Sequence, residues 1–266
     1  MREASVPAVQ TGVSAAPLAF FSFPEVVDPR RHRDYNAWHQ LDHLPENRAL
    51  RGVIHGERWV RTPACRAAAG ALGESDPTLD AAHYVAMYWF AEAAGGRVEP
   101  SVDEWRELGE TTRQQGRRPE LDWTVRRLTG MFRPEVGAVA PRALVSVGAL
   151  PFRPHRGVVL DVLRVHDPVD SQTVPLAPGV AGAWTFTSTQ VQVRAVGAGL
   201  AADPGPGGLR VTLHYCDEDP IEVVAGMGAP DVPGTEPLLR TPLLPVVPWE
   251  WDWFDETSEE GPHGPA

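Results

Sequence analysis

The sequence contains no lysine, so each of its 24 basic side chains is an arginine. It has 35 acidic residues, which gives a formal net charge of −11 at pH 7. Most of the imbalance lies in residues 140–266, which carry 7 arginines and 16 acidic residues. Binding to nucleic acid requires a basic face that neutralises phosphates. The charge balance therefore argues against a nucleic-acid partner.

Cysteine is nearly absent as well. Cys65 and Cys216 stand 151 positions apart, and the sequence has neither a CxxC pair nor a cysteine-histidine cluster. This spacing argues against a disulfide framework or a cysteine zinc site and predicts two reduced thiols. Because the chain also lacks a signal-peptide pattern and an apolar run long enough to span a bilayer, we expect a cytoplasmic protein without a membrane partner.

The first half contains four apolar segments with the length and residue types of strands. They are expected at residues 17–24, 54–61, 82–90 and 123–132, with a loop at 62–80. One helix is expected over residues 33–44, since Pro45 disfavours helical geometry at the residue before it. A second helix is expected to start at Ser101, with Glu104 completing a capping box. The order is βαββαβ, the split ferredoxin-like unit.

The second half repeats this plan more weakly. The step Gly179-Val180 lies 127 positions after Gly52-Val53, and residues 209–216 lie 126 positions after residues 83–90. Self-similarity at a fixed spacing indicates a duplication. In this second unit we expect residues 142–150 to form the first strand and residues 157–167 to stand in place of the first helix. The alternation of tryptophan with acidic residues at 249–253 predicts the closing strand.

The expected domain organisation follows from these patterns. A disordered segment over residues 1–16 precedes a first ferredoxin-like repeat over 17–134 and a degenerate second repeat over 142–254, and an acidic disordered tail follows at 255–266. One such unit leaves one face of its sheet uncovered, which two repeats in one chain can resolve by pairing internally. The predicted fold class is therefore α+β, an intramolecular, pseudo-dimeric α+β barrel. A homodimer beyond the internal pair stays open.

Residues 35–46 hold the densest cluster of ionisable groups in the chain. At about 100° per residue, Tyr35, Trp38, His39 and Asp42 fall on one side of a helix, with His43 one turn beyond His39. Burying such groups is costly unless they are paired or used. We therefore expect His43 and His39 to move protons, with Asp42 orienting one of them. The alternative is a set of structural histidines among core aromatic rings.

Further candidate residues would form the wall of a substrate pocket. Tyr35 and Trp38 on the helix are either core residues or pocket walls. The strand expected at residues 82–90 adds His83, Tyr84, Met87 and Tyr88. At least one of the side chains His83, Tyr84 and Tyr88 should face the pocket. Arg58 is either a surface cation or an anchor for a carboxylate. We expect the largest apolar pocket of the chain at this place in the first repeat.

Three motifs carry a family resemblance. They are Tyr35-Asn36-x-Trp38-His39-x-x-Asp42-His43-Leu44-Pro45, then Arg51-Gly52-Val53, then Tyr84-Val85-Ala86-Met87-Tyr88. Together they resemble the dimeric α+β barrel superfamily, in particular its EthD-like branch. His39 and Gln40 depart from the pattern of that branch, which usually has an aromatic and an acidic residue there. The resemblance implies an apolar pocket between helices and sheet that contains a few histidine, tyrosine or aspartate side chains.

The resemblance implies a range of activities and does not fix one. Members of the superfamily include cofactor-free monooxygenases, polyketide cyclases, dehydratases, decarboxylases, lactone isomerases and haem enzymes. We expect a cofactor-independent acid/base enzyme that acts on an apolar aromatic or polyketide-like molecule in secondary metabolism. The alternatives are a non-catalytic carrier or assembly partner and a haem enzyme. The i, i+4 spacing of His39 and His43 also suits a divalent metal, although no HExxH motif is present.

Overall fold

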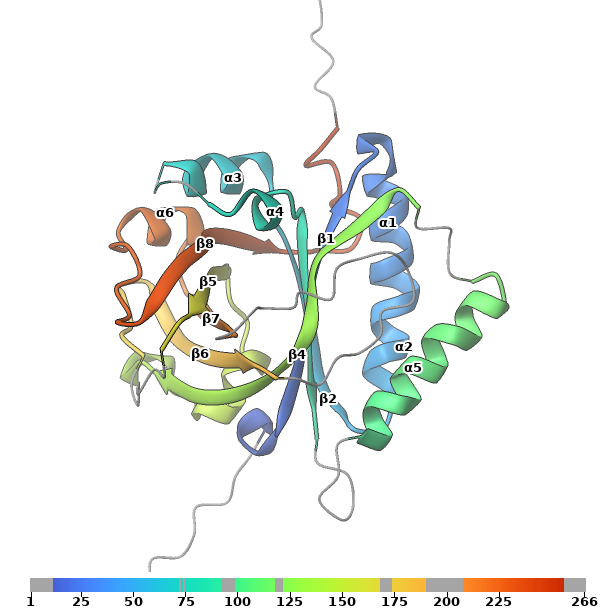
Figure 1. The fold of residues 1–266 in the computed structure, drawn as a ribbon, viewed down its shortest axis with the longest axis horizontal. Helices are drawn as coiled ribbons and strands as arrows, with labels where there is room; N and C mark the ends of the chain where they lie inside the picture. Colours follow the sequence, from blue (N-terminus) through green and yellow to red (C-terminus); the bar gives the residue numbers. More distant parts are fainter. Residues whose placement is uncertain are drawn as a thin grey trace, which may run out of the picture.

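Eight antiparallel strands form one closed barrel in the computed structural model, which describes residues 12–71, 73, 75–91, 99–117, 122–167, 174–189 and 208–255 (Figure 1). The strands are β1 (Leu18–Val26), β2 (Val53–Val60), β3 (Tyr84–Phe90), β4 (Thr124–Val139), β5 (Gly157–Val165), β6 (Val180–Ser188), β7 (Leu209–Cys216) and β8 (Thr235–Pro245). Their order around the barrel is β1-β3-β2-β8-β5-β7-β6-β4. The α+β class and a barrel that contains strands from both halves are thereby confirmed.

The strand order is the same in the two halves of the chain. It reads β4-β1-β3-β2 in the first half and β8-β5-β7-β6 in the second. The two seams between the halves differ in length. At one seam β4 pairs with β6 from Phe132 to Val139, whereas at the other β2 and β8 share only the pairs Trp59 with Pro245 and Val60 with Leu244.

The α-helices lie outside the barrel in two groups, one of which includes a π-helical turn (Figure 1). Beside β1 and β4 lie α1 (His32–Trp38), the π-helical turn η3 (His39–His43), α2 (Leu44–Ala49) and α5 (Glu99–Gln114). Near β8 lie α3 (Pro63–Gly70), α4 (Pro77–Asp80) and α6 (Pro220–Ala225). Short 3-10 helices complete the fold: η1 (Gly12–Ala15), η2 (Pro29–Arg31), η4 (Pro141–Ala143) and η5 (Val147–Phe152). In the part of the chain that is described, none of the helices combines the length and apolarity needed to cross a membrane.

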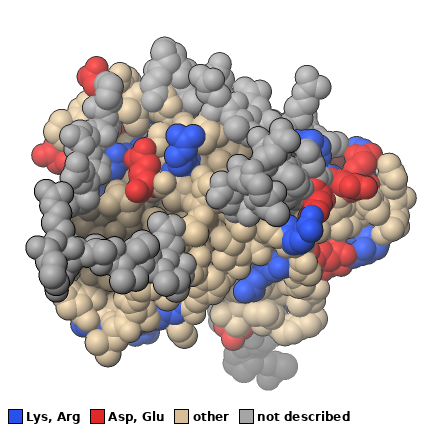
Figure 2. Space-filling model, turned by 90° about the horizontal axis from the view of Figure 1, so that it is seen from below, with Lys and Arg blue, Asp and Glu red and all other residues tan. Residues whose placement is uncertain are grey.

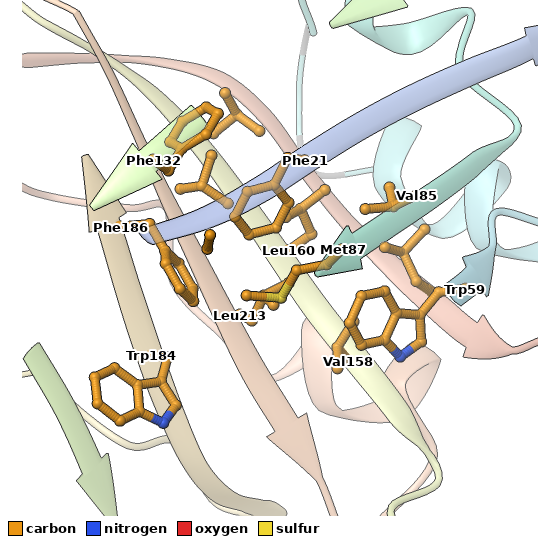
Figure 3. Packing of buried hydrophobic residues seen from close by; sticks show 14 of the residues in the cluster. Phe21, Trp59, Val85, Met87, Phe132, Val158, Leu160, Trp184, Phe186 and Leu213 are labelled. Atoms are coloured by element: carbon orange, nitrogen blue, oxygen red, sulfur yellow. The ribbon is translucent and has the colours of Figure 1, made fainter. Parts of the chain in front are cut away.

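The barrel interior is a continuous apolar core. Successive side chains of a strand point to opposite faces, so alternate residues of each strand point inward. Phe21, Met87, Leu160 and Leu213 come from four different strands and point toward one another (Figure 3). Phe186 packs edge-on against Phe21, with ring centroids 5.1 Å apart. This packing leaves mainly the outer faces of the sheet for polar chemistry.

Several expected elements of the second half are wrong. Residues 142–150 do not form a strand, because η4 and η5 occupy this segment, which lies between Pro141 and Pro151. Residues 157–167 were expected at the place that the first helix occupies in the first half. Most of them form the strand β5 instead, in agreement with the strand preference of valine-rich sequence. The closing strand is β8, and the tryptophans that follow it lie in turns and coil, where Trp251 is buried beside Tyr35 and Tyr84.

Smaller differences concern the first half and the ends of the chain. The expected loop at 62–80 contains α3 and α4, and α5 begins at Glu99, so Ser101 is not its N-cap. Within the expected disordered segment, η1 is ordered and Val13 is buried, while residues 1–11 lie outside the described residues. Asp255 forms an ion pair with Arg33, and the rest of the expected tail, 256–266, is likewise not described.

The described surface carries its charges in mixed order. On the face seen in Figure 2, arginine side chains lie interspersed with acidic ones. Single ion pairs follow the same pattern, for example those of Arg31 with Asp34 and of Arg164 with Glu236. Exposed pairs of this kind add little to stability, so the fold depends mainly on the barrel core.

A core truncation tests this dependence. Leu160 has no exposed surface, and Leu160→Ala should lower the free energy of unfolding by about 3 kcal/mol through lost burial and the cavity left behind. Leu144 is 90% exposed, and Leu144→Ala should change the same free energy by less than about 0.5 kcal/mol. Urea unfolding of both variants measures the difference, and equal effects would contradict the assignment of the core.

Candidate active site

The predicted catalytic residues lie on a π-helical turn. We expected the helix to end before Pro45. Instead, the chain continues from α1 through η3 into α2. Within η3 the N–H of Leu44 donates to the carbonyl oxygen of His39, five residues earlier. A proline ring in a regular helix clashes with the carbonyl four residues before it, and the wider turn gives this ring room. Single π turns of this kind are frequent at functional sites.

His39 is a buried histidine in an aromatic surrounding. Only 5% of its surface is exposed, and its ring centroid lies 5.6 Å from those of Tyr35 and Trp38 and 5.1 Å from that of His43. Its Nδ1 atom is buried without a hydrogen-bond partner. Burial lowers the pKa of His39 well below its ordinary value, and the positive charge of Arg58 adds to this effect. The ring is therefore neutral at pH 7 and can accept a proton.

His43 is held in place by two contacts. Its ring stacks on Trp38 with the centroids 4.6 Å apart. Its Nε2 atom lies 3.1 Å from the amide nitrogen of Asn47, which also donates to the hydroxyl oxygen of Tyr88 at 3.1 Å. Because an amide nitrogen only donates, Nε2 of His43 accepts in this contact. This leaves His39 as the histidine of the pair with an unengaged ring nitrogen.

Asp42 does not orient a histidine. Its Oδ1 atom accepts from Arg117 at 2.8 Å on the outer side of the helix, and the same guanidinium also pairs with Glu46. The expectation failed because the π turn rotates the helix surface between His39 and His43, so that a regular 100° step no longer describes it.

A small cavity lies between the helix and the outer face of the sheet. Its volume is about 40 Å³. It is lined by Phe20, Ser22, Pro24, Tyr35, Trp38, His39, His43, Ala86, Tyr88, Thr124 and Arg126. Five of the predicted residues therefore meet at one place.

The remaining predicted wall residues lie elsewhere. Met87 points into the barrel, since odd-numbered residues of β3 face inward (Figure 3). Tyr84 faces outward but sits in a neighbouring polar group, where its hydroxyl oxygen lies 2.9 Å from Nδ1 of His32 and accepts from Asn36 at 2.9 Å. His83 lies next to this group and accepts the backbone N–H of Val26 through Nδ1 at 3.2 Å. The placement of Met87 corrects its prediction as a pocket wall.

Two arginines lie at or near the cavity, and of these Arg126 was not foreseen. Arg58, for which a surface position was one expectation, is 5% exposed and donates to Oδ1 of Asn36 at 2.6 Å. Its guanidinium lies over the rings of Tyr35 and Tyr84, at 4.8 Å and 4.7 Å from their centroids. Arg126 lines the cavity, and burial lowers the pKa of both arginines. The position of an arginine inside an expected strand was the sequence signal for Arg58.

Comparison with known proteins adds a distant structural likeness. No model of a protein family matches the chain, and no curated protein matches it at a significant level. One solved structure to which the chain is similar is described as an anthrone oxidase-like protein. It shares 10% sequence identity at a TM-score of 0.48, over 89% of this chain and 94% of that chain. A likeness at this level does not assign an activity.

Two further observations concern ligands. Among the described residues, no group of three or more histidine, cysteine, aspartate or glutamate side chains is placed to hold a metal ion. Contrary to the expectation that favoured the first half, the cavity of about 420 Å³ on the second half is larger than the cavity of about 40 Å³ beside His39. The first half has a helix over its sheet, whereas no helix is described between β5 and β6.

The buried histidines predict a loss of stability in acid. A histidine whose pKa is lower in the folded state takes up its proton first in the unfolded chain, so stability falls as the pH drops below about 6.5. His39 should account for about 2 kcal/mol of the loss between pH 7 and pH 5. His32 and His83, with their pKa values lowered to about 4 and about 3, act with the same sign. Urea unfolding at both pH values should give a smaller loss for His39→Gln, and equal losses would contradict the neutral, buried state of His39.

Proposed function

We propose that the chain is a cofactor-independent enzyme that transfers protons on an apolar small molecule, with His39 as its base. The observation that carries this proposal is the buried, neutral ring of His39, whose Nδ1 atom has no partner and which lines a cavity. A base in this state meets no competing hydrogen bond and is unprotonated at neutral pH, so it can take up a proton from a substrate. The proposal changes the sequence-based assignment in two respects, because His43 becomes a residue that positions the site and Asp42 no longer orients a histidine.

The chemistry of the site suits removal of a proton from a carbon or hydroxyl group. The C–H or O–H bond breaks, the proton binds Nδ1 of His39, and the electron pair stays on the substrate as an enolate or phenolate. The positive charges of Arg126 and Arg58 stabilise such an anion in a site of low dielectric constant. Cyclases, dehydratases, isomerases and cofactor-free monooxygenases can all begin with this step.

The size of the cavity limits what it accepts. Sites for drug-sized ligands measure roughly 300–1,000 Å³, so about 40 Å³ admits only the reacting end of a molecule. Phe20, Trp38 and Tyr88 would contact that end, which favours an aromatic or polyketide-like substrate. A carrier that retains the pocket without chemistry is the alternative, and turnover separates the two.

We also infer that the halves are two ferredoxin-like repeats of an EthD-like ancestor. The row of paired residues Thr129, Ser22, Ala86 and Arg58 crosses the first half, and the row Arg240, Asp161, Thr212 and Thr185 crosses the second. Strands with the same place in the order contribute to each row, which supports a common origin. The second repeat would then have lost its first helix.

Haem does not fit the described site. A porphyrin needs a cavity many times larger than about 40 Å³, and the ring of His43 is stacked on Trp38 and bonded through Nε2. A divalent metal on the helix would need Nε2 of His43 or the unpartnered Nδ1 of His39, without a nearby carboxylate, since Asp42 and Glu46 pair with Arg117. The proposal therefore requires no cofactor.

Deuterium exchange tests the proposed base without knowledge of the full reaction. In heavy water the protein should accelerate exchange of the acidic C–H protons of 2-tetralone, an aromatic ketone, as followed by NMR. His39→Gln should lower the rate about 100-fold, a typical effect of removing a general base. His43→Gln should slow exchange less, because His43 orients the site. A wild-type rate equal to that of His39→Gln would count against proton transfer and favour a carrier.

The purified protein should be colourless. Its visible spectrum should contain no Soret band, and elemental analysis should find no stoichiometric zinc, iron or copper. A Soret band that disappears in His39→Ala or His43→Ala would support a haem enzyme instead.

A further inference from the structure

The second half has its own cavity on the outer face of its four strands. The volume of about 420 Å³ falls within the range of small-molecule sites. Outward side chains of the strands form its floor, namely Asp161, Leu163, Thr185, Arg210, Thr212, His214 and Arg240. Residues 174–177 and 226–232 form the opposite wall, where Leu176 and Met227 are apolar.

The polar residues on this floor are set by strand pairing. Arg240 on β8, Asp161 on β5, Thr212 on β7 and Thr185 on β6 are direct partners across neighbouring strands. His214 lies two residues beyond Thr212 on the same face of β7. Groups fixed on paired strands hold their geometry better than groups on loops. The floor is therefore a rigid array rather than a chance meeting of side chains.

Asp161 is the centre of the array. It accepts two hydrogen bonds from Arg240, from Nε to Oδ1 at 2.5 Å and from Nη2 to Oδ2 at 2.6 Å. Its Oδ2 atom also lies 3.2 Å from Nε2 of His214. Burial opposes ionisation of Asp161, but the hydrogen bonds from Arg240 and His214 outweigh it and lower the pKa. Asp161 is thus a carboxylate that only accepts.

This contact determines which nitrogen of His214 is free. Because Asp161 only accepts, Nε2 of His214 donates to it, and in the tautomer with its hydrogen on Nε2 the Nδ1 atom carries a lone pair. His214 is 5% exposed, and its Nδ1 atom is buried without a hydrogen-bond partner. A buried polar atom without a partner is costly, which is consistent with a ligand group that supplies the missing donor.

The charges around the cavity indicate the kind of donor. Arg240 is neutralised by its pairing with Asp161, while Arg210, 5% exposed, has its Nη1 atom 3.6 Å from Oε2 of Glu135. Arg210 lines the cavity and places its guanidinium charge there, and Asp231 lines the opposite wall. A ligand hydroxyl that donates to His214 and develops negative charge matches this arrangement, and Leu163, Leu176 and Met227 suit an apolar ring.

We propose that the outer face of the second half is a separate binding site for an apolar molecule with a weakly acidic hydroxyl group, a phenol or an enol. His214 accepts the hydroxyl proton through Nδ1, and Asp161 with Arg240 holds the ring of His214 in position. On transfer the O–H bond breaks, an N–H bond forms at Nδ1, and the electron pair remains on the oxygen. This goes beyond the proposed function, since it concerns a different cavity and different residues.

The probe for this site is 4-nitrophenol, whose ionisation is visible as a yellow colour. The wild-type protein should bind it saturably and increase its ionised fraction at a fixed pH below neutrality. The methyl ether 4-nitroanisole has the same shape without the proton and should bind at least about tenfold more weakly, the typical effect of one buried hydrogen bond. Absence of saturable 4-nitrophenol binding up to millimolar concentration would overturn the proposal.

Four variants locate the site and separate it from the first half. His214→Gln keeps a donor for Asp161 but removes the base, so it should weaken binding about tenfold and abolish the colour change. Ala177→Trp should block binding by filling the cavity, without touching His214. His39→Gln and His166→Gln should leave binding unchanged, and thermal unfolding verifies that each variant is folded. Binding that survives both His214→Gln and Ala177→Trp, or that is lost in His39→Gln, would overturn the assignment.

Discussion

Closure of the barrel is the constraint on which the rest of the structure depends. A four-stranded half has two open edges and one uncovered apolar face, and the seams β4–β6 and β2–β8 pair the edges of the halves while their inner faces bury one another. Since alternate residues of every strand point inward, the interior is filled by side chains such as Phe21 and Leu213. Reactive groups are thereby confined mainly to the two outer faces.

The outer faces differ because, among the residues that the structure describes, only the first half has a helix across the centre of its sheet. In the first half α1, η3 and α2 lie on the sheet, and Tyr35 and His39 fill most of the space against Tyr88. In the second half His214 occupies the position equivalent to Tyr88, and the larger cavity lies above it. Each face also carries one arginine in its row of paired residues, but Arg58 is held by aromatic rings and Arg240 by a carboxylate. The same framework thus presents a nearly closed, aromatic site and an open, charged one.

The sequence allowed the class, the strands of the first half and the cluster beneath the first helix to be predicted, because apolar periodicity and residue spacing are local properties. It could not reveal the π turn, which depends on how Pro45 is accommodated, and the placement of Asp42 failed with it. The prediction for Met87 failed because β3 is apolar on both faces, so its sequence does not show which alternate residues point into the barrel. The pair Asp161 and His214 was missed because these residues are 53 positions apart and meet only across paired strands.

A buried carboxylate, Glu57, is an exception to the apolar interior. It helps to explain why residues 142–150, which were expected to form a strand, form a connection instead. Glu57 has the inward parity of Trp59, yet its pKa is lowered, since the hydrogen bond from His155 and the nearby imidazole of His55 outweigh the burial that raises it. Nε2 of His155 donates to Glu57 at 2.9 Å, and Leu150 from the same connection joins the core. The barrel already has eight strands, so a further strand at 142–150 would have had no edge to pair with. The connection instead passes near one end of the barrel and supplies the partner without which a buried carboxylate would be severely destabilising.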